Sequence, residues 1–382
     1  MRVRLKTLAA AGLLLTALAF LPMVLRALPV TPRSVGPQRD ESSWRGILTV
    51  WLVETWRPAA DSHSAWLTAQ ARSFEKANDG VLLHIESVSP QAAVRAMEGV
   101  EAAPDVVIWG SGVPWVQPER FADLAPMGDD VLPEALLEAC AMSGSDERRA
   151  VPLALGGYAL LINADAAKAQ GLSPDTEGLR DALASTGKGK MGWNAPVPGY
   201  TGRIAPLVAA WGLTALGLPT EGLREDAAMA WPAYALDAST LGYIGTQREV
   251  SRLATLAAAG KTFAWTAVAS HAYTDQLLLF SRAPRARHLG ATEYAARTST
   301  VEAWLAHLLS DTAQAYLARI GAFRAVPGEP LYHEGAMALI ETALQTPQPA
   351  ALWMLPEENA ALRQALKACR SASQAFELLR LP

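Results

Sequence analysis

Residues 47–53 read ILTVWLV, a nearly continuous apolar run of the kind expected of a strand covered on both faces. Residues 64–78 follow with apolar side chains at helical spacing, and residues 81–88 largely alternate apolar and polar side chains, as a second strand does. A short helix is predicted over 90–99, and residues 105–109 (DVVIW) form a third apolar strand. This alternation predicts a parallel sheet with right-handed crossovers, and such a sheet binds ligands at the carboxyl ends of its strands.

The pattern changes near residue 126, and a second α/β unit follows. Two strand-like segments, 150–155 and 158–163, lie on either side of Gly156 and Gly157. The other predicted elements are a helix over 132–141, a helix ending at Gly171, a short segment over 190–194, helices over 204–212, 247–259, 300–320 and 362–372, and a strand over 262–268.

Composition and charge exclude several classes of protein. Hydrophobic residues make up 51% of the 382 residues and charged residues 18%, which rules out global disorder. Without residues 1–30 the chain has 29 basic against 37 acidic residues, a net charge of −8. A mildly acidic body argues against nucleic acid and anionic lipid as main partners. Cys140 and Cys369 are too few for a disulfide scaffold; they either pair or remain two separate thiols.

The amino terminus has the layout of an export signal. Arg2, Arg4 and Lys6 precede an uncharged, mostly apolar stretch over 7–25. We predict that residues 1–28 are a signal peptide or, if left uncut, a membrane anchor. Residues rich in Pro, Ser and charge follow and predict a flexible tether over 29–44. The body of the protein is therefore expected in the periplasm or another extracytoplasmic space.

The order of several segments resembles the extracellular solute-binding proteins of ABC importers, in particular the carbohydrate-binding group called family 1. These segments are the helix ending FEKAN at 74–78, 103–109 (APDVVIW), 121–126 (FADLAP), 151–165 (VPLALGGYALLINAD), 259–264 (AGKTFA) and the late helix and loop over 304–327. The similar segments span residues 47–327, almost the whole body.

The resemblance implies an α/β fold of the type II periplasmic-binding-protein kind. Two lobes, each a mixed sheet flanked by helices, would close by a hinge on a ligand held in the cleft between them. The first lobe would comprise 45–125 and 291–325, and the second 126–290 and 326–382. The chain would then cross between the lobes three times.

Glu54, Trp56 and Arg57 follow the first predicted strand and are candidate ligand-binding residues. A carboxylate and a guanidinium bind the hydroxyls of a polyhydroxylated ring, and an indole face packs on its C–H groups. The alternative is that Trp56 is a packing residue and that Glu54 and Arg57 form a local ion pair.

Four further candidates lie farther along the chain. Ser111, between two glycines after the third strand, offers a hydroxyl donor or belongs to a plain turn. His271 follows the strand predicted over 262–268 and either binds a hydroxyl or is simply exposed. The resemblance adds Tyr158 as a cleft residue and Trp353 as a stacking aromatic, although each also fits a packed core.

The sequence therefore predicts a monomeric, non-catalytic protein that captures a sugar or polyol and delivers it to the permease subunits of an ABC transporter. No cofactor or metal is expected: the six histidines form no H-E-x-x-H motif, and there is no nucleotide-binding P-loop. Two alternatives remain open. One is a secreted carbohydrate-active hydrolase or lyase, and the other is a sensor or scaffold derived from a binding protein.

Overall fold

The structure is a computed structural model of the 382-residue chain. It describes residues 44–99, 104–142, 145–169, 171–173, 242–284, 290–350, 352–353, 356–368, 374 and 377–378. The predicted signal, the tether before Trp44, Cys369, and the segments predicted over 190–194 and 204–212 lie outside the described residues.

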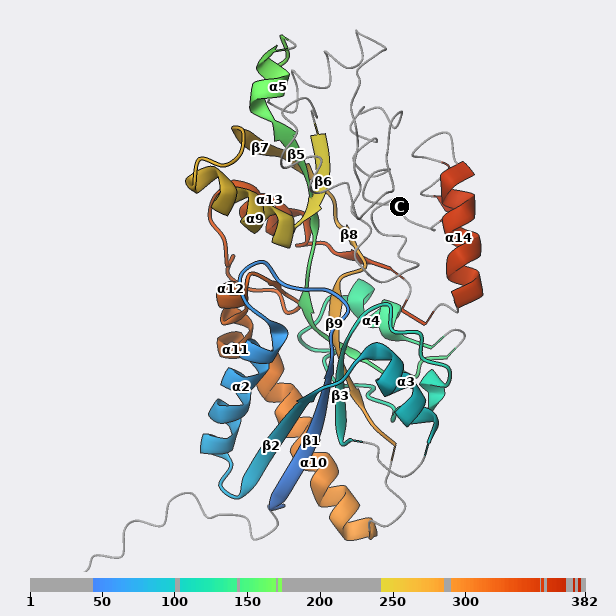
Figure 1. Ribbon diagram of the computed structural model, residues 1–382. Coiled ribbons are helices and arrows are strands. Elements are labelled where there is room, and N and C mark those ends of the chain that lie inside the picture. The colour runs from blue at the N-terminus through green and yellow to red at the C-terminus, as the bar shows by residue number, and fades with distance from the viewer. Residues whose placement is uncertain are drawn as a thin grey trace, which may run out of the picture. The chain divides into compact units, whose positions relative to one another are not determined.

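The first predicted strands form one half of a six-stranded sheet with the order β10-β4-β9-β3-β1-β2. β1 (Gly46–Val53) lies between β2 (Val81–Ser87) and β3 (Val106–Gly110), and both pairings are parallel. All of β3 and the last four residues of β1 are buried, as their apolar runs predicted. Since Val53 pairs with Trp109, the carboxyl ends of β1 and β3 lie at the same edge of the sheet (Figure 1).

The other half of this sheet is antiparallel, which the strand–helix pattern did not predict. β9 (Leu277–Arg282) pairs with β3 on one side and with β4 (Val151–Leu155) on the other. β10 (Phe323–Arg324) completes the sheet beside β4. The apolar run LLLFSR of β9 was missed because no helix separates it from the preceding strands, so it did not fit the expected alternation. The six-stranded sheet is therefore mixed.

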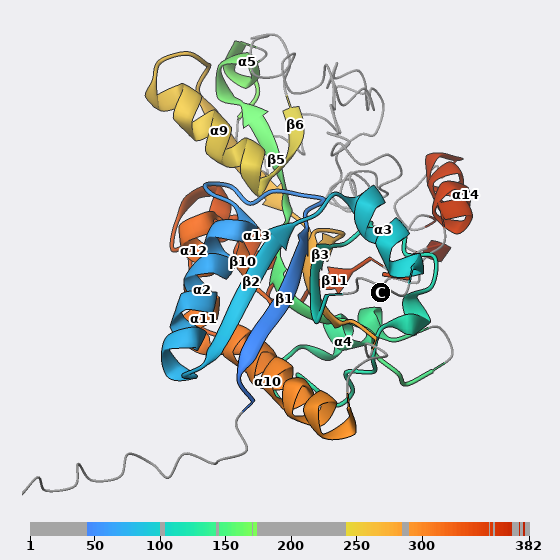
Figure 2. The same ribbon diagram turned by 60° about the horizontal axis from the view of Figure 1, so that its bottom comes forward.

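Helices pack on this sheet where their periodicity predicted. α2 (His63–Ala77) begins after Ser62, whose hydroxyl accepts the Ala65 N–H at 3.1 Å, and packs on β2. α3 (Pro90–Glu98) is capped by Ser89 in the same way, and α4 (Glu134–Cys140) packs on β4. Figure 2 shows α2 beside β2.

The helix predicted over 300–320 is divided into three. α10 (Ala291–Leu309) starts earlier and ends at Ser310, which in turn caps α11 (Asp311–Ala315). α12 (Leu317–Ile320) follows and ends at Gly321, whose φ of 76° lies in the left-handed region that glycine adopts without strain. The Ser310 hydroxyl accepts the Ala313 N–H, so the break is stabilised as a new helix start rather than left as a kink.

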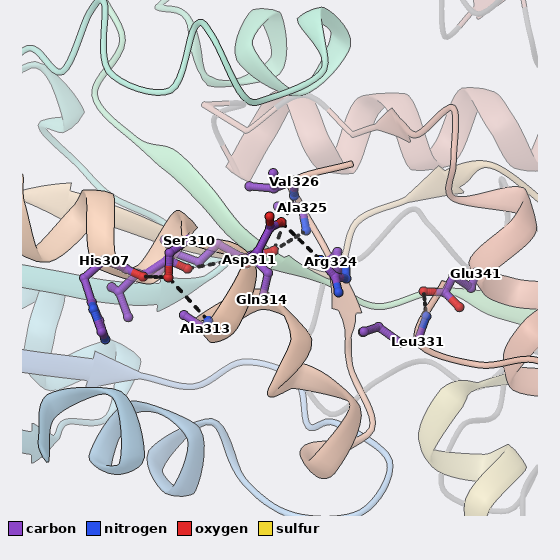
Figure 3. A network of polar contacts seen from close by, with 12 residues as sticks. His307, Ser310, Asp311, Ala313, Gln314, Arg324, Ala325, Val326, Leu331 and Glu341 are labelled. Carbon is purple, nitrogen blue, oxygen red and sulfur yellow. Dashed lines mark hydrogen bonds and ion pairs between the residues drawn. The ribbon is translucent and has the colours of Figure 1, made fainter. Parts of the chain in front are cut away.

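Gln314, on α11, joins three segments from the middle of the core, as Figure 3 shows. Its buried side-chain N–H₂ group donates to the carbonyls of Leu153 at 2.9 Å and Leu308 at 3.0 Å. Its side-chain oxygen accepts the backbone N–H groups of Ala325 and Val326. One amide thus satisfies four buried polar groups and fixes where the chain leaves β10.

A second sheet has the order β6-β5-β7 and is antiparallel throughout. β5 (Tyr158–Asn163) is central, between β6 (Gly242–Thr246) and β7 (Trp265–Ser270). β6 was not predicted, and β7 begins three residues later than the strand expected over 262–268. α9 (Gln247–Ala258) and α13 (Gly335–Ala343) pack on this sheet, and α5 (Ala164–Ala169) follows β5.

The remaining described elements are short or lie near the carboxyl end. β8 (Tyr273–Thr274) pairs with β11 (Gln348–Pro349) in a two-stranded sheet. α14 (Pro356–Ala368) overlaps the helix predicted over 362–372.

The sheet pairing differs from the predicted lobe boundaries in one respect. Those boundaries put 126–290 in the second lobe, whereas β4 and β9 hydrogen-bond within the sheet that contains β1. The first exchange between the sheets occurs at Gly156 and Gly157, between β4 and β5, rather than near residue 126. Both β4 and β9 are almost entirely buried, so their apolar sequences suit a central position in either sheet and do not identify the sheet to which they belong.

Candidate functional site

The loop between β1 and α2 is bounded by these two elements and packs at its middle on the end of α12. Glu54 follows the last residue of β1, and Ser62 starts α2. In between, the Ala59 N–H donates to the carbonyl of Gly321 at 3.0 Å, at the end of α12. A side chain at Gly321 would collide with Ala59, since its Cβ would lie 2.4 Å from the Ala59 Cβ. This packing fixes the loop that carries three of the candidate residues.

Glu54 is bonded to His63, the first residue of α2. The Nδ1 atom of His63 lies 3.1 Å from Oε1 of Glu54. Burial would raise the pKa of the Glu54 carboxyl, but the hydrogen bond and charge of His63, with the Arg57 guanidinium, hold that pKa below its ordinary value. Burial lowers the pKa of His63 by more than Glu54 raises it. At neutral pH the pair is thus a carboxylate and a neutral imidazole, and the carboxylate side chain is 29% exposed.

Trp56 is buried rather than displayed. Its indole N–H donates to the carbonyl of Leu277 at 3.0 Å, and its ring stands edge-on to the His63 ring with centroids 4.4 Å apart. Only 5% of the residue is exposed. Trp56 therefore ties the end of β1 to the start of β9.

Arg57, in contrast, is exposed, and its guanidinium makes no hydrogen bond or ion pair to the described residues. Its backbone carbonyl accepts a 3.4 Å hydrogen bond from the side chain of Gln247, at the start of α9. This bond joins the loop after β1 to a helix that packs on the three-stranded sheet.

Ser111 follows β3 and is also buried. Its hydroxyl donates to the carbonyl of Asp275 and accepts the Leu277 N–H at 3.0 Å. Its own carbonyl accepts the Thr55 hydroxyl at 2.8 Å. The neighbouring Gly110 is needed for this contact, because a Cβ there would lie 2.2 Å from Thr55 Oγ1. Ser111 thus joins the ends of β1 and β3 to the segment before β9.

Tyr158 opens β5 and is fully buried. Its hydroxyl donates to Oδ1 of Asp275 at 2.8 Å. Two buried amides lie close by: the Gln247 side chain accepts the Gly157 N–H at 3.0 Å and donates to the side chain of Gln276 at 2.9 Å. A polar network therefore fills the places where the chain passes from one sheet to the other.

His271 lies between β7 and β8 and is half-buried. Its Nδ1 atom accepts the backbone N–H of Tyr273 at 2.9 Å, and burial lowers the pKa of the imidazole. In the neutral form the hydrogen is therefore on Nε2.

Trp353 is half-buried and packs on a group of aromatic side chains. Its ring lies 5.4 Å from that of Trp109, which in turn contacts Trp115. Its indole N–H donates to the carbonyl of Cys140 at 3.0 Å. The Cys140 thiol is buried, and burial raises its pKa to about 12.

The structure thus separates the predicted residues by exposure. Glu54, Arg57, His271 and Trp353 keep accessible surface, whereas Trp56, Ser111 and Tyr158 are packed and hydrogen-bonded. His63, Asp275, Gln247 and Gln276 were not selected from the sequence, although all four bond to candidate residues or to the loops that carry them. Only His63 is close in the sequence to a candidate residue that it bonds: it is the first residue of α2, nine residues after Glu54. The other three lie far along the chain from the candidates or loops that they contact, so no pattern in the sequence indicated them.

Within the described residues, no cluster of three or more His, Cys, Asp or Glu side chains is arranged to hold a metal ion. None of the described helices combines the length and apolar character that a membrane crossing requires.

The fold is shared with solved structures of sugar-binding proteins. The GacH receptor of Streptomyces glaucescens, solved unliganded and with acarbose, has a TM-score of 0.54 at 16% identity, over 88% of this chain and 99% of its own. A cyclic α-maltosyl-1,6-maltose binding protein from Arthrobacter globiformis has a TM-score of 0.55 at 14% identity, covering 88% and 97%. The sugar-binding protein MalE from Xanthomonas citri has a TM-score of 0.55 at 12% identity, covering 88% and 96%.

No protein-family model matches the chain, and no curated protein matches it. At identities of 12% to 16% the similarity to solved structures establishes the fold alone. The fold class predicted from the sequence is confirmed: the chain has the α/β, two-lobe architecture of periplasmic binding proteins. A mixed sheet was predicted for each lobe; the six-stranded sheet is mixed, whereas the three-stranded sheet is antiparallel in the described residues. These structural neighbours are binding proteins rather than enzymes.

Proposed function

We propose that this chain is an extracytoplasmic solute-binding protein. It captures a sugar or polyol between two lobes and delivers it, as a monomer, to the permease subunits of an ABC importer. The fold supports this function, and similar structures include proteins described as binding maltose-type sugars and chitin oligosaccharide. Export would rest on the amino-terminal signal predicted over 1–28.

The lobes are best divided by sheet. The six-stranded sheet belongs to the first lobe and the three-stranded sheet to the second. The crossings then fall at Gly156 and Gly157, in the segment between β8 and β9, and between β10 and α13. This division replaces the boundaries near residues 126 and 290 and keeps the one near 326.

One observation supports the proposal: Glu54 and Arg57 lie on the loop after β1, and the Arg57 carbonyl accepts a hydrogen bond from Gln247 of α9, which packs on the three-stranded sheet. Glu54 lies at the carboxyl end of β1, where α/β sheets bind ligands, and its carboxylate is ionised and partly exposed. The exposed Arg57 follows three residues later. A carboxylate and a guanidinium bind sugar hydroxyls through charge-assisted hydrogen bonds.

The seven predicted residues then divide into two roles. Glu54, Arg57, His271 and Trp353 are proposed to contact the solute, with Trp353 offering an apolar ring face. The three buried residues are proposed to hold the loops of the site in place without touching the solute. Their polar atoms bond to the segment of 275–277; they are Trp56, Ser111 and Tyr158.

Capture follows from closure. A solute that touches both lobes gains contacts only in the closed form, so its binding shifts the population toward closure. The contact between the Gln247 side chain and the Arg57 carbonyl spans the proposed lobes and is therefore sensitive to this motion. The protein is proposed to release the solute chemically unchanged. A hydrolase would instead need a second carboxyl group across the cleft from Glu54.

The test is a screen of sugars and polyols against the full chain. A ligand should raise the melting temperature by mass action, because it adds about 2.7 kcal/mol to the free energy of unfolding at a hundred times its dissociation constant. Tryptophan fluorescence and calorimetry should give saturable binding, and chromatography should recover the solute intact. X-ray scattering with the ligand should show a more compact particle. Recovery of cleaved products, or no binding across the panel, would overturn the proposal.

A further inference from the structure

His63 has a feature that packing alone does not explain. The residue is fully buried, and its Nε2 atom makes no hydrogen bond to any described residue. A buried polar atom without a partner costs free energy that an apolar side chain at the same place would avoid. The other ring nitrogen bonds to Glu54, a residue with accessible surface at the carboxyl end of β1.

The hydrogen bond fixes the state of both partners. An ionised carboxylate accepts hydrogen bonds and cannot donate them, so His63 must carry its hydrogen on Nδ1 and donate it to Oε1. The edge-on Trp56 ring blocks the rotation of the imidazole. The His63 ring thus occupies Oε1 of Glu54, and the backbone N–H of His63 also acts on the same carboxylate.

Few charged groups act on this pair. Glu54 is influenced by His63 and by Arg57 from its own loop, and His63 is influenced by Glu54. Asp61, two residues before His63, accepts the Ser62 N–H at 2.8 Å. Trp56 is the aromatic contact of the imidazole. The state of Glu54 therefore depends chiefly on His63, through its ring hydrogen bond and its charge and then through its backbone N–H.

We propose that His63 is a positioning residue for solute binding: it holds Glu54 ionised and oriented so that the second carboxylate oxygen accepts a hydroxyl group of the solute. This inference rests on the proposed function and deepens it. It makes Glu54 an acceptor for hydroxyl donors, and it makes the buried imidazole a determinant of affinity although His63 itself does not touch the solute.

The test compares His63→Leu with His63→Asn in the full chain. Asparagine places a donor N–H close to the position of Nδ1, whereas leucine fills the space without a donor. Affinity for a sugar found in the screen is measured by calorimetry at pH 7.5, and circular dichroism verifies folding. We expect His63→Leu to weaken binding about tenfold or more and His63→Asn by less than about threefold. Equal affinity of all three proteins would overturn the proposal.

A pH profile distinguishes positioning from a general structural effect. In the wild type, affinity should persist until the pH falls below the lowered pKa of Glu54. In His63→Leu, burial is no longer offset by the hydrogen bond, so the pKa of Glu54 rises and affinity is lost at a higher pH. His63→Asn should follow the wild type. An unchanged midpoint in His63→Leu would contradict the proposal.

His307→Leu is the matched control for His63→Leu. His307 is also a histidine with a lowered pKa and a buried Nε2 that lacks a hydrogen-bond partner, but it stacks on Trp304 in α10. The same substitution there should leave affinity and the pH profile unchanged. If His307→Leu weakened binding as much as His63→Leu, the effect at His63 would be general destabilisation.

One measurement needs no ligand and separates this inference from the proposed function. Nuclear magnetic resonance of the ligand-free chain should show His63 with its hydrogen on Nδ1 and Glu54 titrating below its ordinary range. His63→Leu should raise the pKa of Glu54. If these results are obtained but no sugar or polyol of the screen binds, the pairing is supported and the sugar function is rejected. A hydrogen on Nε2, or an unshifted Glu54, would reject the pairing even if sugars bind.

Discussion

Two carboxylates of this protein each bond to a ring side chain, yet their surroundings differ. Glu54 is paired with His63 at the end of β1 and keeps 29% of its side chain exposed. Asp275 is paired with Tyr158 where the chain passes between the two sheets, and only 8% of the residue is exposed.

The comparison separates the proposed binding group Glu54 from a framework group of similar chemistry, Asp275. The backbone of Asp275 is held by Ser111, and its carboxylate fixes the start of β5 through Tyr158. Glu54 has one ring partner and keeps accessible surface, so solvent reaches its carboxylate without disruption of the core. Exposure, rather than residue type, therefore decides which pair is available to a solute.

Trp56 connects the two pairs, and its removal should have the largest effect. The indole packs on His63 and donates to Leu277, two residues after Asp275. Trp56→Ala should destabilise the protein by about 3–5 kcal/mol, measured by urea unfolding. Trp56→Phe keeps a ring but loses the hydrogen bond, so about 1 kcal/mol is expected from that loss. Trp353→Ala, at a half-buried site, should cost less than Trp56→Ala; the reverse order would contradict this assignment.

Tyr158→Phe tests the buried pair. The substitution removes the hydroxyl that donates to Asp275 and leaves a buried carboxylate with one partner fewer, so a loss of about 1.5–3 kcal/mol is expected. Affinity for a solute should stay within about twofold, because the hydroxyl serves the framework. Glu54→Gln should show the opposite pattern, with weak binding and a smaller change in stability. If Tyr158→Phe reduced affinity without loss of stability, Tyr158 would be a contact residue.

The free energy of unfolding should decrease in acid because His63, the partner of Glu54, is buried in its neutral form. His63 has a lowered pKa in the folded protein, while the unfolded chain binds a proton near pH 6.5. Stability should therefore be complete above pH 6.5 and fall as the pH drops, by at most about 1.4 kcal/mol per pH unit for one proton. His63→Asn should flatten this slope in urea unfolding from pH 7 to 5. A slope would remain from His271 and His307, whose pKa values are also lowered. An unchanged slope would mean that His63 is not buried in its neutral form.

The fold could be predicted where apolar periodicity and helix caps are local. The apolar run of β1 and the helical spacing of apolar side chains over 64–78 identify strand and helix from neighbouring residues alone. The pairing of β9 could not be predicted in this way, because its partners β3 and β4 lie more than a hundred residues earlier. Local patterns do not record such long-range pairing, so they did not indicate that β4 and β9 belong to the sheet of β1.

The candidate site shows the same limit. The predicted strand ends gave the position of Glu54 and Ser111 in the fold, since both follow a strand at the carboxyl edge of the sheet. Their exposure was not predictable, because it depends on partners distant in sequence. Ser111 is covered by Asp275, 164 residues away, whereas Glu54 bonds only nine residues away and remains partly accessible.

Arg57→Ala is the mildest test of the comparison. Its side chain is exposed and makes no hydrogen bond within the described residues, so stability should change by less than about 0.5 kcal/mol. Arg57 also lowers the pKa of Glu54, but as the smallest of the named causes, so the acid limit of binding should move upward only slightly. Affinity at neutral pH should fall if the guanidinium contacts the solute. Calorimetry at pH 7.5 measures this directly, and Arg252→Ala, on the exposed side of α9, is the control. Unchanged binding in Arg57→Ala would restrict direct recognition on this loop to Glu54 and would sharpen the contrast between one available carboxylate and one buried carboxylate.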